Sequence, residues 1–245
     1  MKNIGPFKIW HTVLALALVF TASAHFQLVD KVLAVYTNYT FSSEVKMVME
    51  MHDEKGELTT MNFDLMFSPD GGYYGLNMEM APMGTPINAQ SVISLSDNKV
   101  TTLINQAGMK MGMEYDLSKP INMPGGKAAT KKANNTEVSY QKTGKTKTIA
   151  GYTCNQYTAK ANDDSYTEIW TTKELSYSNF YESFSKINQQ MGAFPKNMPE
   201  GFVMELSSWP EGKDDKEKYQ MQVVSVNKSK AGSISTDGYT IMKVN

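Results

Sequence analysis

Apolar and polar residues alternate at every second position over much of this chain, and that period predicts β-strands. Alternation runs through residues 44–51, 57–67, 73–80 and 109–117. Further strands are expected at 151–160 and 166–172, and a last hairpin at 202–209 and 218–227. Asp97 and Asn98 separate two further apolar stretches, at 92–96 and 99–105, and their turn chemistry predicts a tight hairpin. One apolar side and one polar side per strand is typical of an antiparallel sheet that is dry on one face and wet on the other.

Two segments follow the helical period instead. Residues 26–36 have apolar positions at helical spacing, which predicts a short amphipathic helix. Between residues 177 and 191 the spacing i, i+3, i+4, i+7 is carried by Tyr177, Phe180, Tyr181, Phe184, Ile187 and Met191. Ser176 is a suitable N-cap, and Gly192 with Pro195 ends the run. We expect a mainly β (α+β) fold in which these helices cover the dry face of the sheet.

The N-terminus has the layout of a secretory signal peptide over residues 1–24. Lys2 and Lys8 precede an apolar stretch, and Ala22-Ser23-Ala24 forms an A-x-A cleavage site. The apolar stretch is shorter than the roughly 20 residues that span a bilayer. We therefore expect an exported protein, periplasmic or secreted, whose mature part is a single domain over residues 25–245 with no transmembrane segment.

Charge is balanced, with 24 basic and 25 acidic residues, and every base is a lysine. Without arginine or net positive charge, nucleic-acid binding is not expected. Residues 118–136 are rich in Pro, Gly, Lys and Asn, which predicts a long exposed loop. The lysines between residues 127 and 147 are interpreted as part of a solvated segment, with an acidic lipid head group as the alternative partner.

Few residues could support catalysis. After signal cleavage only His25 and His52 remain as imidazoles, so a histidine-dependent triad is not expected. Cys154 is the single cysteine, which excludes an internal disulfide and indicates a buried thiol. The paired carboxylates, such as Asp163 with Asp164, lie in polar turns rather than enclosed sites. We expect a non-enzymatic protein with no cofactor.

Three motifs resemble a known family. They are Ile149-Ala150-Gly151-Tyr152-Thr153-Cys154, then Glu168-Ile169-Trp170-Thr171-Thr172-Lys173-Glu174-Leu175, and finally Gly238-Tyr239 near the C-terminus. An I-x-G-Y-x-C strand followed by a W-x-T-K-x-L strand is similar to the exported bacterial proteins of the domain of unknown function 4412. That family is similar in layout to lipoprotein carriers of the LolA/LolB type. The resemblance implies a curved antiparallel sheet, an incomplete β-barrel, with one or two helices covering its concave face.

Methionine is the most unusual component, with 18 residues, several of them at period two on the strands. One interpretation is ordinary core packing, and a second is a deformable apolar pocket, because methionine suits surfaces that fit variable ligands. A third is Cu(I) binding through thioethers, although i and i+2 side chains on a strand lie about 7 Å apart.

The primary hypothesis is a half-barrel that holds a lipid, an acyl chain or a lipidated partner. A closed-core envelope module, making peripheral envelope contacts, is the alternative, and a periplasmic Cu(I)-binding protein is the third option. The residues expected to line the pocket are Met47, Met49, Met78, Met80, Met109, Met111 and Met113. Those expected on the covering helix are Tyr177, Phe180, Tyr181 and Phe184.

Overall fold

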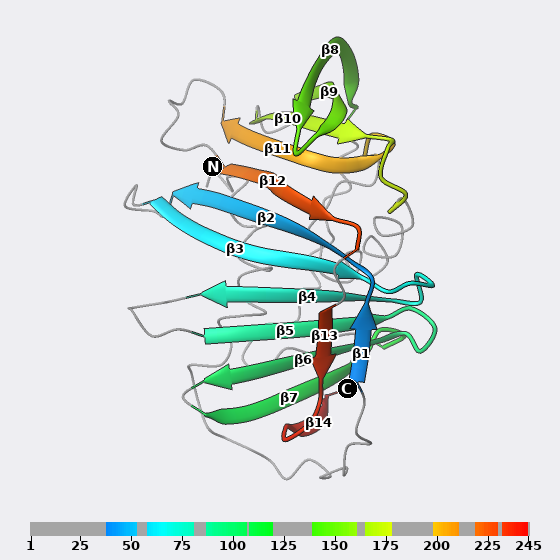
Figure 1. Ribbon diagram of the computed structural model, residues 1–245. Helices are drawn as coiled ribbons and strands as arrows, with labels where there is room; N and C mark the ends of the chain where they lie inside the picture. Colours follow the sequence, from blue (N-terminus) through cyan, green and yellow to red (C-terminus); the bar gives the residue numbers. More distant parts are fainter. Residues whose placement is uncertain are drawn as a thin grey trace. The chain divides into compact units, whose positions relative to one another are not determined.

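The computed structural model describes residues 38–52, 58–80, 87–106, 108–119, 139–160, 165–177, 198–210, 219–229 and 232–244. Within these ranges every regular element is a β-strand (Figure 1). The predicted mainly β, antiparallel architecture is confirmed. The predicted helix at 26–36 lies outside the described residues, as does the second helix from residue 178 onward. Tyr177 is described and is not in a helix, so the structure gives no support to covering helices.

Most strands lie where the sequence predicts them, whereas β1, β8 and β13 were not predicted. The chain's contacts divide the strands into two compact units. Of the described residues, those within 47–60 and 129–224 belong to the first unit, and those within 17–46, 61–128 and 225–245 belong to the second. The strands are β1 (Asn38–Phe41), β2 (Ser43–His52), β3 (Leu58–Phe67), β4 (Tyr73–Met80), β5 (Ile87–Ser94), β6 (Lys99–Gln106), β7 (Met109–Asp116), β8 (Gln141–Ile149), β9 (Tyr152–Lys160), β10 (Ser165–Thr172), β11 (Phe202–Pro210), β12 (Tyr219–Asn227), β13 (Gly232–Ser235) and β14 (Thr240–Val244).

In the second unit the strand order is β3-β4-β5-β6-β7-β14. The pairs from β3 to β7 are antiparallel, and the predicted hairpin at Asp97 and Asn98 joins β5 to β6. The expectation of antiparallel pairing throughout is wrong at one edge, because β14 pairs with β7 in parallel. A parallel neighbour needs a long connection, and here more than a hundred residues separate the two strands.

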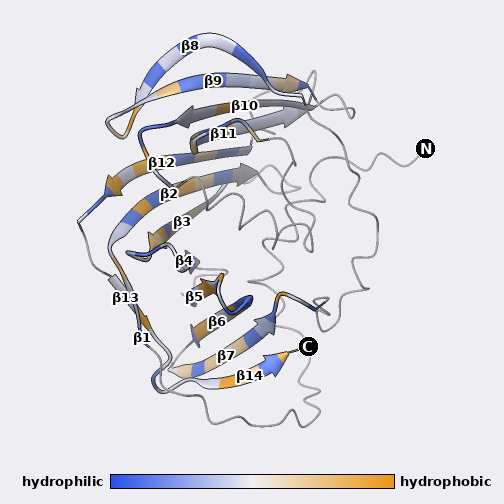
Figure 2. Ribbon diagram, turned by 90° about the vertical axis from the view of Figure 1, so that its right-hand side faces the viewer, coloured by the Kyte–Doolittle hydropathy of each residue, from blue (hydrophilic) through white to orange (hydrophobic). Residues whose placement is uncertain are grey.

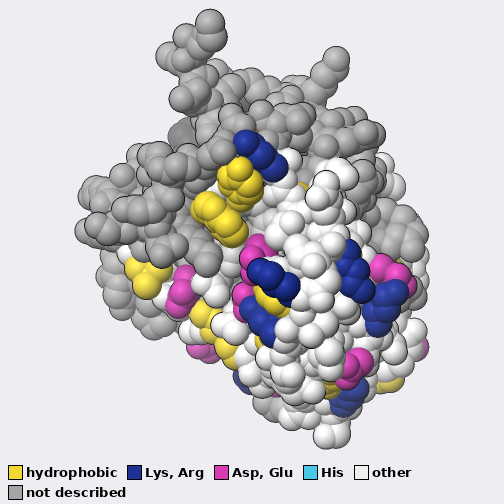
Figure 3. Space-filling view, turned by 90° about the horizontal axis from the view of Figure 1, so that it is seen from above, with side chains coloured by type: hydrophobic (Ala, Val, Ile, Leu, Met, Phe, Trp, Pro, Cys, Tyr) yellow, Lys and Arg dark blue, Asp and Glu magenta, His cyan; other side chains and the backbone are white. Residues whose placement is uncertain are grey.

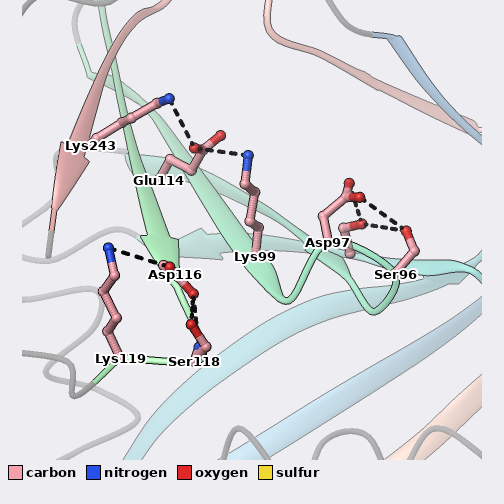
Figure 4. A network of polar contacts seen from close by, with 9 residues as sticks. Ser96, Asp97, Lys99, Glu114, Asp116, Ser118, Lys119 and Lys243 are labelled. Atoms are coloured by element: carbon pink, nitrogen blue, oxygen red, sulfur yellow. Dashed lines mark hydrogen bonds and ion pairs between the residues drawn. The ribbon is translucent and has the colours of Figure 1, made fainter.

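Ion pairs stabilise the parallel pairing of β14 with β7. Glu114 on β7 lies 3.3 Å from Lys99 Nζ on β6 and 3.9 Å from Lys243 Nζ on β14 (Figure 4). Lys110 adds a contact at the start of β7, where its Nζ lies 5.4 Å from the centroid of the Tyr239 ring. The G-Y motif before β14 therefore positions the last strand through an aromatic–cation contact.

A separate two-stranded sheet, β1 with β13, crosses one face of the second unit's sheet (Figures 1 and 2). Phe41 and Ile234, both 1% exposed, pack there against Met66, Val92 and Leu103. The sequence predicts that this side of the strands is wet, and at the centre of the sheet that prediction is wrong. Gly75 leaves the space that the Phe41 ring fills, so a core forms on the face where alternation places polar residues.

The first unit has the order β12-β11-β10-β9-β8 in antiparallel register. Its end strand β8 lies inside the lysine-rich segment interpreted as solvated loop, and for residues 141–147 that interpretation is wrong. Ala150 and Gly151 both adopt positive φ, 48° and 86°, the conformation of a tight two-residue hairpin turn. The Ile149-Ala150-Gly151-Tyr152 motif is therefore the turn that pairs β8 with β9.

The strand β8 keeps most of its side chains in solvent because it lies at an edge of the strand order. Eight of its nine residues are exposed or half-exposed. Charged side chains and an irregular register, here between Lys142 and Thr146, are common protections of an edge strand against pairing with other chains. The alternation signal failed here because both sides of such a strand are polar. On the face shown in Figure 3, lysine and acidic side chains are interspersed.

Candidate ligand-binding face

The face of the second unit's sheet opposite β1 and β13 gathers the apolar positions of five strands. The registers align them in three rows across β3, β4, β5, β6 and β7. We call this surface the methionine face. Its rows are Phe63, Met78, Ala89, Ile104 and Met111; Leu65, Leu76, Ser91, Thr102 and Met113; and Phe67, Tyr74, Ile93, Val100 and Tyr115.

Three of the sequence-predicted pocket residues lie on this face. Met78 and Met111 stand in the same row, with Ala89 and Ile104 between them, and Met113 stands in the next row. All three methionines are half-buried, whereas Ala89 and Ile104 are only 2% and 4% exposed. Thioether side chains thus surround a buried aliphatic centre.

The other predicted residues on these strands have different settings. Met80 pairs with Ile87 at the end of β4. Met109, at the start of β7, is 61% exposed, so it stands at the solvent margin of the face.

The remaining predicted residues belong to the first unit or lie outside the described ranges. Met47 and Met49 are buried on β2 within the first unit. Tyr177 packs edge-on against Phe202, with ring centroids 5.6 Å apart. Phe180, Tyr181 and Phe184 lie outside the described residues, and their place in a covering helix stays a prediction.

Sequence reasoning missed the polar groups within the methionine face. The hydroxyls of Ser91 and Thr102 lie 3.1 Å apart and hydrogen-bond to each other, and both residues are buried. Tyr115, 8% exposed, donates its hydroxyl to Met113 Sδ at 3.4 Å. Burial raises the pKa of Tyr115 to about 12, which keeps the phenol neutral. The sequence signal that could have indicated them is a hydroxyl residue, Ser91 or Thr102, at a position of β5 or β6 where alternation places apolar residues.

A second polar group lies on the first unit's sheet and joins both family motifs. Lys147 Nζ lies 2.7 Å from Glu205 Oε1 and 4.2 Å from the centroid of the Trp170 ring. Trp170 donates its indole N–H to Glu168 at 2.7 Å. Trp170 and Glu205 are cross-strand partners, and Lys147 is the partner of Cys154. Each polar group here has a protein partner, so the arrangement explains the motif residues as supports of the sheet.

The predicted buried thiol is confirmed. Cys154 is fully buried, and its thiol donates to the Tyr152 carbonyl oxygen at 3.3 Å. Burial raises the pKa of this thiol, which disfavours the reactive thiolate.

The described residues contain no group of three or more His, Cys, Asp or Glu side chains that could hold a metal ion. The Cu(I) interpretation concerns thioether ligands instead, and it stays a prediction. The part of the chain that the structure describes also contains no helix long and apolar enough to cross a membrane.

Comparisons with known proteins concern both sequence and structure. Comparison of the sequence with curated proteins finds no match. Among solved structures, PNGF-II is similar at 12% identity with a TM-score of 0.41, over 84% of this chain and 31% of that one. This chain thus spans about a third of PNGF-II.

Two further solved structures are also similar. The MucA/MucB complex of Pseudomonas aeruginosa matches at 12% identity and a TM-score of 0.37, over 80% of this chain and 52% of that one. A LolA superfamily protein of Nitrosomonas europaea matches at 9% identity and a TM-score of 0.27, over 76% and 86% of the two chains.

Family membership rests on a direct sequence match. The family model described as a domain of unknown function, DUF4412, matches residues 41–234, which include β8 to β10 with their I-x-G-Y-x-C and W-x-T-K-x-L motifs. The family expected from these motifs is thereby confirmed. The chain belongs to the DUF4412 family.

Proposed function

We propose that this protein is a non-enzymatic binding protein of the cell envelope that holds an apolar ligand, an acyl chain or a lipidated partner, against the methionine face. The observation that carries the proposal is the row in which Met78 and Met111 flank Ala89 and Ile104. Long, unbranched thioether side chains around a flat aliphatic centre can adjust to chains of different length and unsaturation.

The composition of the face supports an apolar ligand over a charged one. None of its fifteen positions carries an ionisable acid or base other than the phenols of Tyr74 and Tyr115. Transfer of hydrocarbon from water to such a surface contributes about 0.8 kcal/mol for each buried CH₂ group. An acyl chain of a dozen carbons could therefore gain enough free energy to bind even after the cost of immobilisation.

Export is part of the proposal. The layout of residues 1–24 as a signal peptide supports a location in the periplasm or outside the cell.

A closed-core envelope module is the second candidate, and one observation favours it. Ala89, Ile104 and Tyr115 are 2%, 4% and 8% exposed, which suits a face that the chain itself covers. The two candidates differ in whether a ligand can take up this position.

Binding of a fluorescent acyl probe to the purified mature protein tests the proposal. Met111→Asp places a charge in the proposed contact surface and should weaken probe binding at least tenfold, since an unpaired buried charge costs several kcal/mol. Val224→Asp is the matched control, because Val224 is an apolar strand residue that is 51% exposed. Far-UV circular dichroism of each variant separates lost binding from lost folding.

Two outcomes would contradict the proposal. One is a wild-type protein that takes up no acyl probe and carries no lipid-mass adduct when isolated without detergent and weighed by native mass spectrometry. The other is a Met111→Asp variant that stays folded and binds as well as the wild type. Either result would favour the closed-core module.

A further inference from the structure

The methionine face is apolar except for a few hydroxyl groups, and those of Ser91 and Thr102 have unused hydrogen-bonding capacity. Ser91 and Thr102 face each other on β5 and β6 and share one hydrogen bond of 3.1 Å. Two hydroxyls carry two protons, and this bond uses one of them. The second proton can be donated to an acceptor placed over the pair.

A third hydroxyl lies in the neighbouring row. Tyr115 is two residues from Met113, and Met113 is the cross-strand partner of Thr102. The Tyr115 hydroxyl donates to the Met113 thioether sulfur at 3.4 Å. A thioether is a weak acceptor, so a carbonyl oxygen in reach of this phenol would be a better partner.

Burial decides what kind of acceptor these donors suit. Ser91, Thr102 and Tyr115 are 5%, 3% and 8% exposed, and none of the positions in the three rows is a lysine. A carboxylate brought to this surface would lose its hydration without gaining a cation, which is costly. A neutral carbonyl would lose less hydration free energy. It would also gain hydrogen bonds from the two donors, the second proton of the Ser91–Thr102 pair and the Tyr115 phenol.

Resting on the proposed function, we infer that Ser91, Thr102 and Tyr115 bind the uncharged carbonyl group of an acyl ester or amide whose hydrocarbon chain lies along the methionine face. The inference names the ligand class as a neutral acyl group, as in a lipid or a lipidated partner, in preference to a free fatty-acid anion. Ser91, Thr102 and Tyr115 are then specificity-determining residues, while the methionines supply apolar contact.

Three fluorescent probes of similar length test this class. They are diphenylhexatriene, which has no oxygen, a fatty acid with a fluorophore near its methyl end, and the methyl ester of that acid. At a pH where the acid is ionised, we expect the ester to bind more tightly than the acid. Thr102→Val and Ser91→Ala should each weaken ester binding about fivefold to tenfold, the effect of one hydrogen bond, and leave diphenylhexatriene binding unchanged.

Thr101→Val is the matched control, because Thr101 is an adjacent buried threonine of β6 that faces the opposite side of the sheet, where it pairs with Val92. Tyr115→Phe should act like Thr102→Val. Both Thr102→Val and Tyr115→Phe remove a hydroxyl group but nearly keep the shape of the side chain, so a change in ester binding reports the lost hydrogen bond.

The outcomes separate this inference from the function on which it rests. If the wild type binds none of the probes, the proposed function fails and the inference fails with it. If diphenylhexatriene and the ester bind alike and the hydroxyl variants weaken both equally, the apolar site stands and the carbonyl role is wrong. Tighter binding of the ionised acid than of the ester would also overturn the inference.

Discussion

The ring of Phe41 occupies the space that a side chain at residue 75 would need. A Cβ atom built on Gly75 would lie 2.5 Å from Phe41 Cζ, closer than real Cβ contacts allow. Phe41 comes from β1 and Gly75 from β4, so this contact is one of those that join the separate two-stranded sheet to the second unit's sheet. The glycine is required for close approach and not for an unusual backbone angle.

Gly75→Ala should therefore destabilise the protein by about 1–3 kcal/mol, the usual cost of overpacking a core. Urea denaturation followed by circular dichroism measures this change. In a Phe41→Leu background the smaller, flexible side chain can yield, so the same alanine should cost less than half as much. Equal costs in both backgrounds would show that Phe41 and Gly75 do not interact.

The Lys147–Glu205 pair should respond unequally to loss of either partner. The Glu205 side chain is 11% exposed and that of Lys147 is 35% exposed. Lys147→Met leaves a carboxylate with little access to water and should cost about 2 kcal/mol, below the value for a fully buried pair because the lysine is partly solvated. Glu205→Gln should cost less, since Lys147 can turn toward solvent. Denaturant midpoints of the two variants test this order, and an equal or reversed order would contradict it.

Alkaline pH should destabilise the fold through Tyr115. Burial raises the pKa of Tyr115 from 10.0 to about 12, so the folded state favours the neutral phenol. Below pH 10 the phenol is neutral in both states and the stabilising effect is complete. As the pH rises from 10 toward 12, the unfolded chain ionises first and stability falls.

Tyr115→Phe should flatten this pH dependence without removing it, because burial also raises the pKa of Tyr140 to about 12. Urea midpoints across the alkaline range provide the measurement. An unchanged slope in Tyr115→Phe would show that the phenol ionises freely in the folded protein.

Cys154 should resist thiol reagents in the folded protein. It is fully buried and its pKa is raised by burial, so the thiolate is both inaccessible and scarce. Ellman's reagent should react with it only at the rate at which the chain opens, and at full speed in denaturant. Thr153→Cys combined with Cys154→Ala supplies a matched control, because Thr153 is exposed on the same strand. Rapid labelling of the native wild type would contradict this prediction.

Local chemistry was enough to predict most strands of this protein. The alternation in residues 73–80 gives β4 with its bounds unchanged, and Asp97-Asn98 fixes the hairpin between β5 and β6. The turn residues Ala150 and Gly151, with the nearby Cys154, also identified the family. Such features can be predicted because each depends on residues close in sequence, whose side-chain period and turn preferences act locally.

The candidate site was predictable only in part. Alternation places Met111 and Met113 on one side of their strand, but the register across β5 and β6 decides that Met78 shares a row with Met111. Ser91 and Thr102 carry no signal of their own, because their importance comes from being cross-strand neighbours.

The sequence by itself determined most of the strands, the buried thiol and the family, since each is encoded in short segments. Only the tertiary structure decided that β14 joins β7 in parallel, that Lys147 reaches Glu205, and that Phe41 covers Gly75. These relationships join residues from 34 to more than 100 positions apart. Which distant segments meet depends on how all of the apolar surfaces are buried together, and no local pattern encodes that choice.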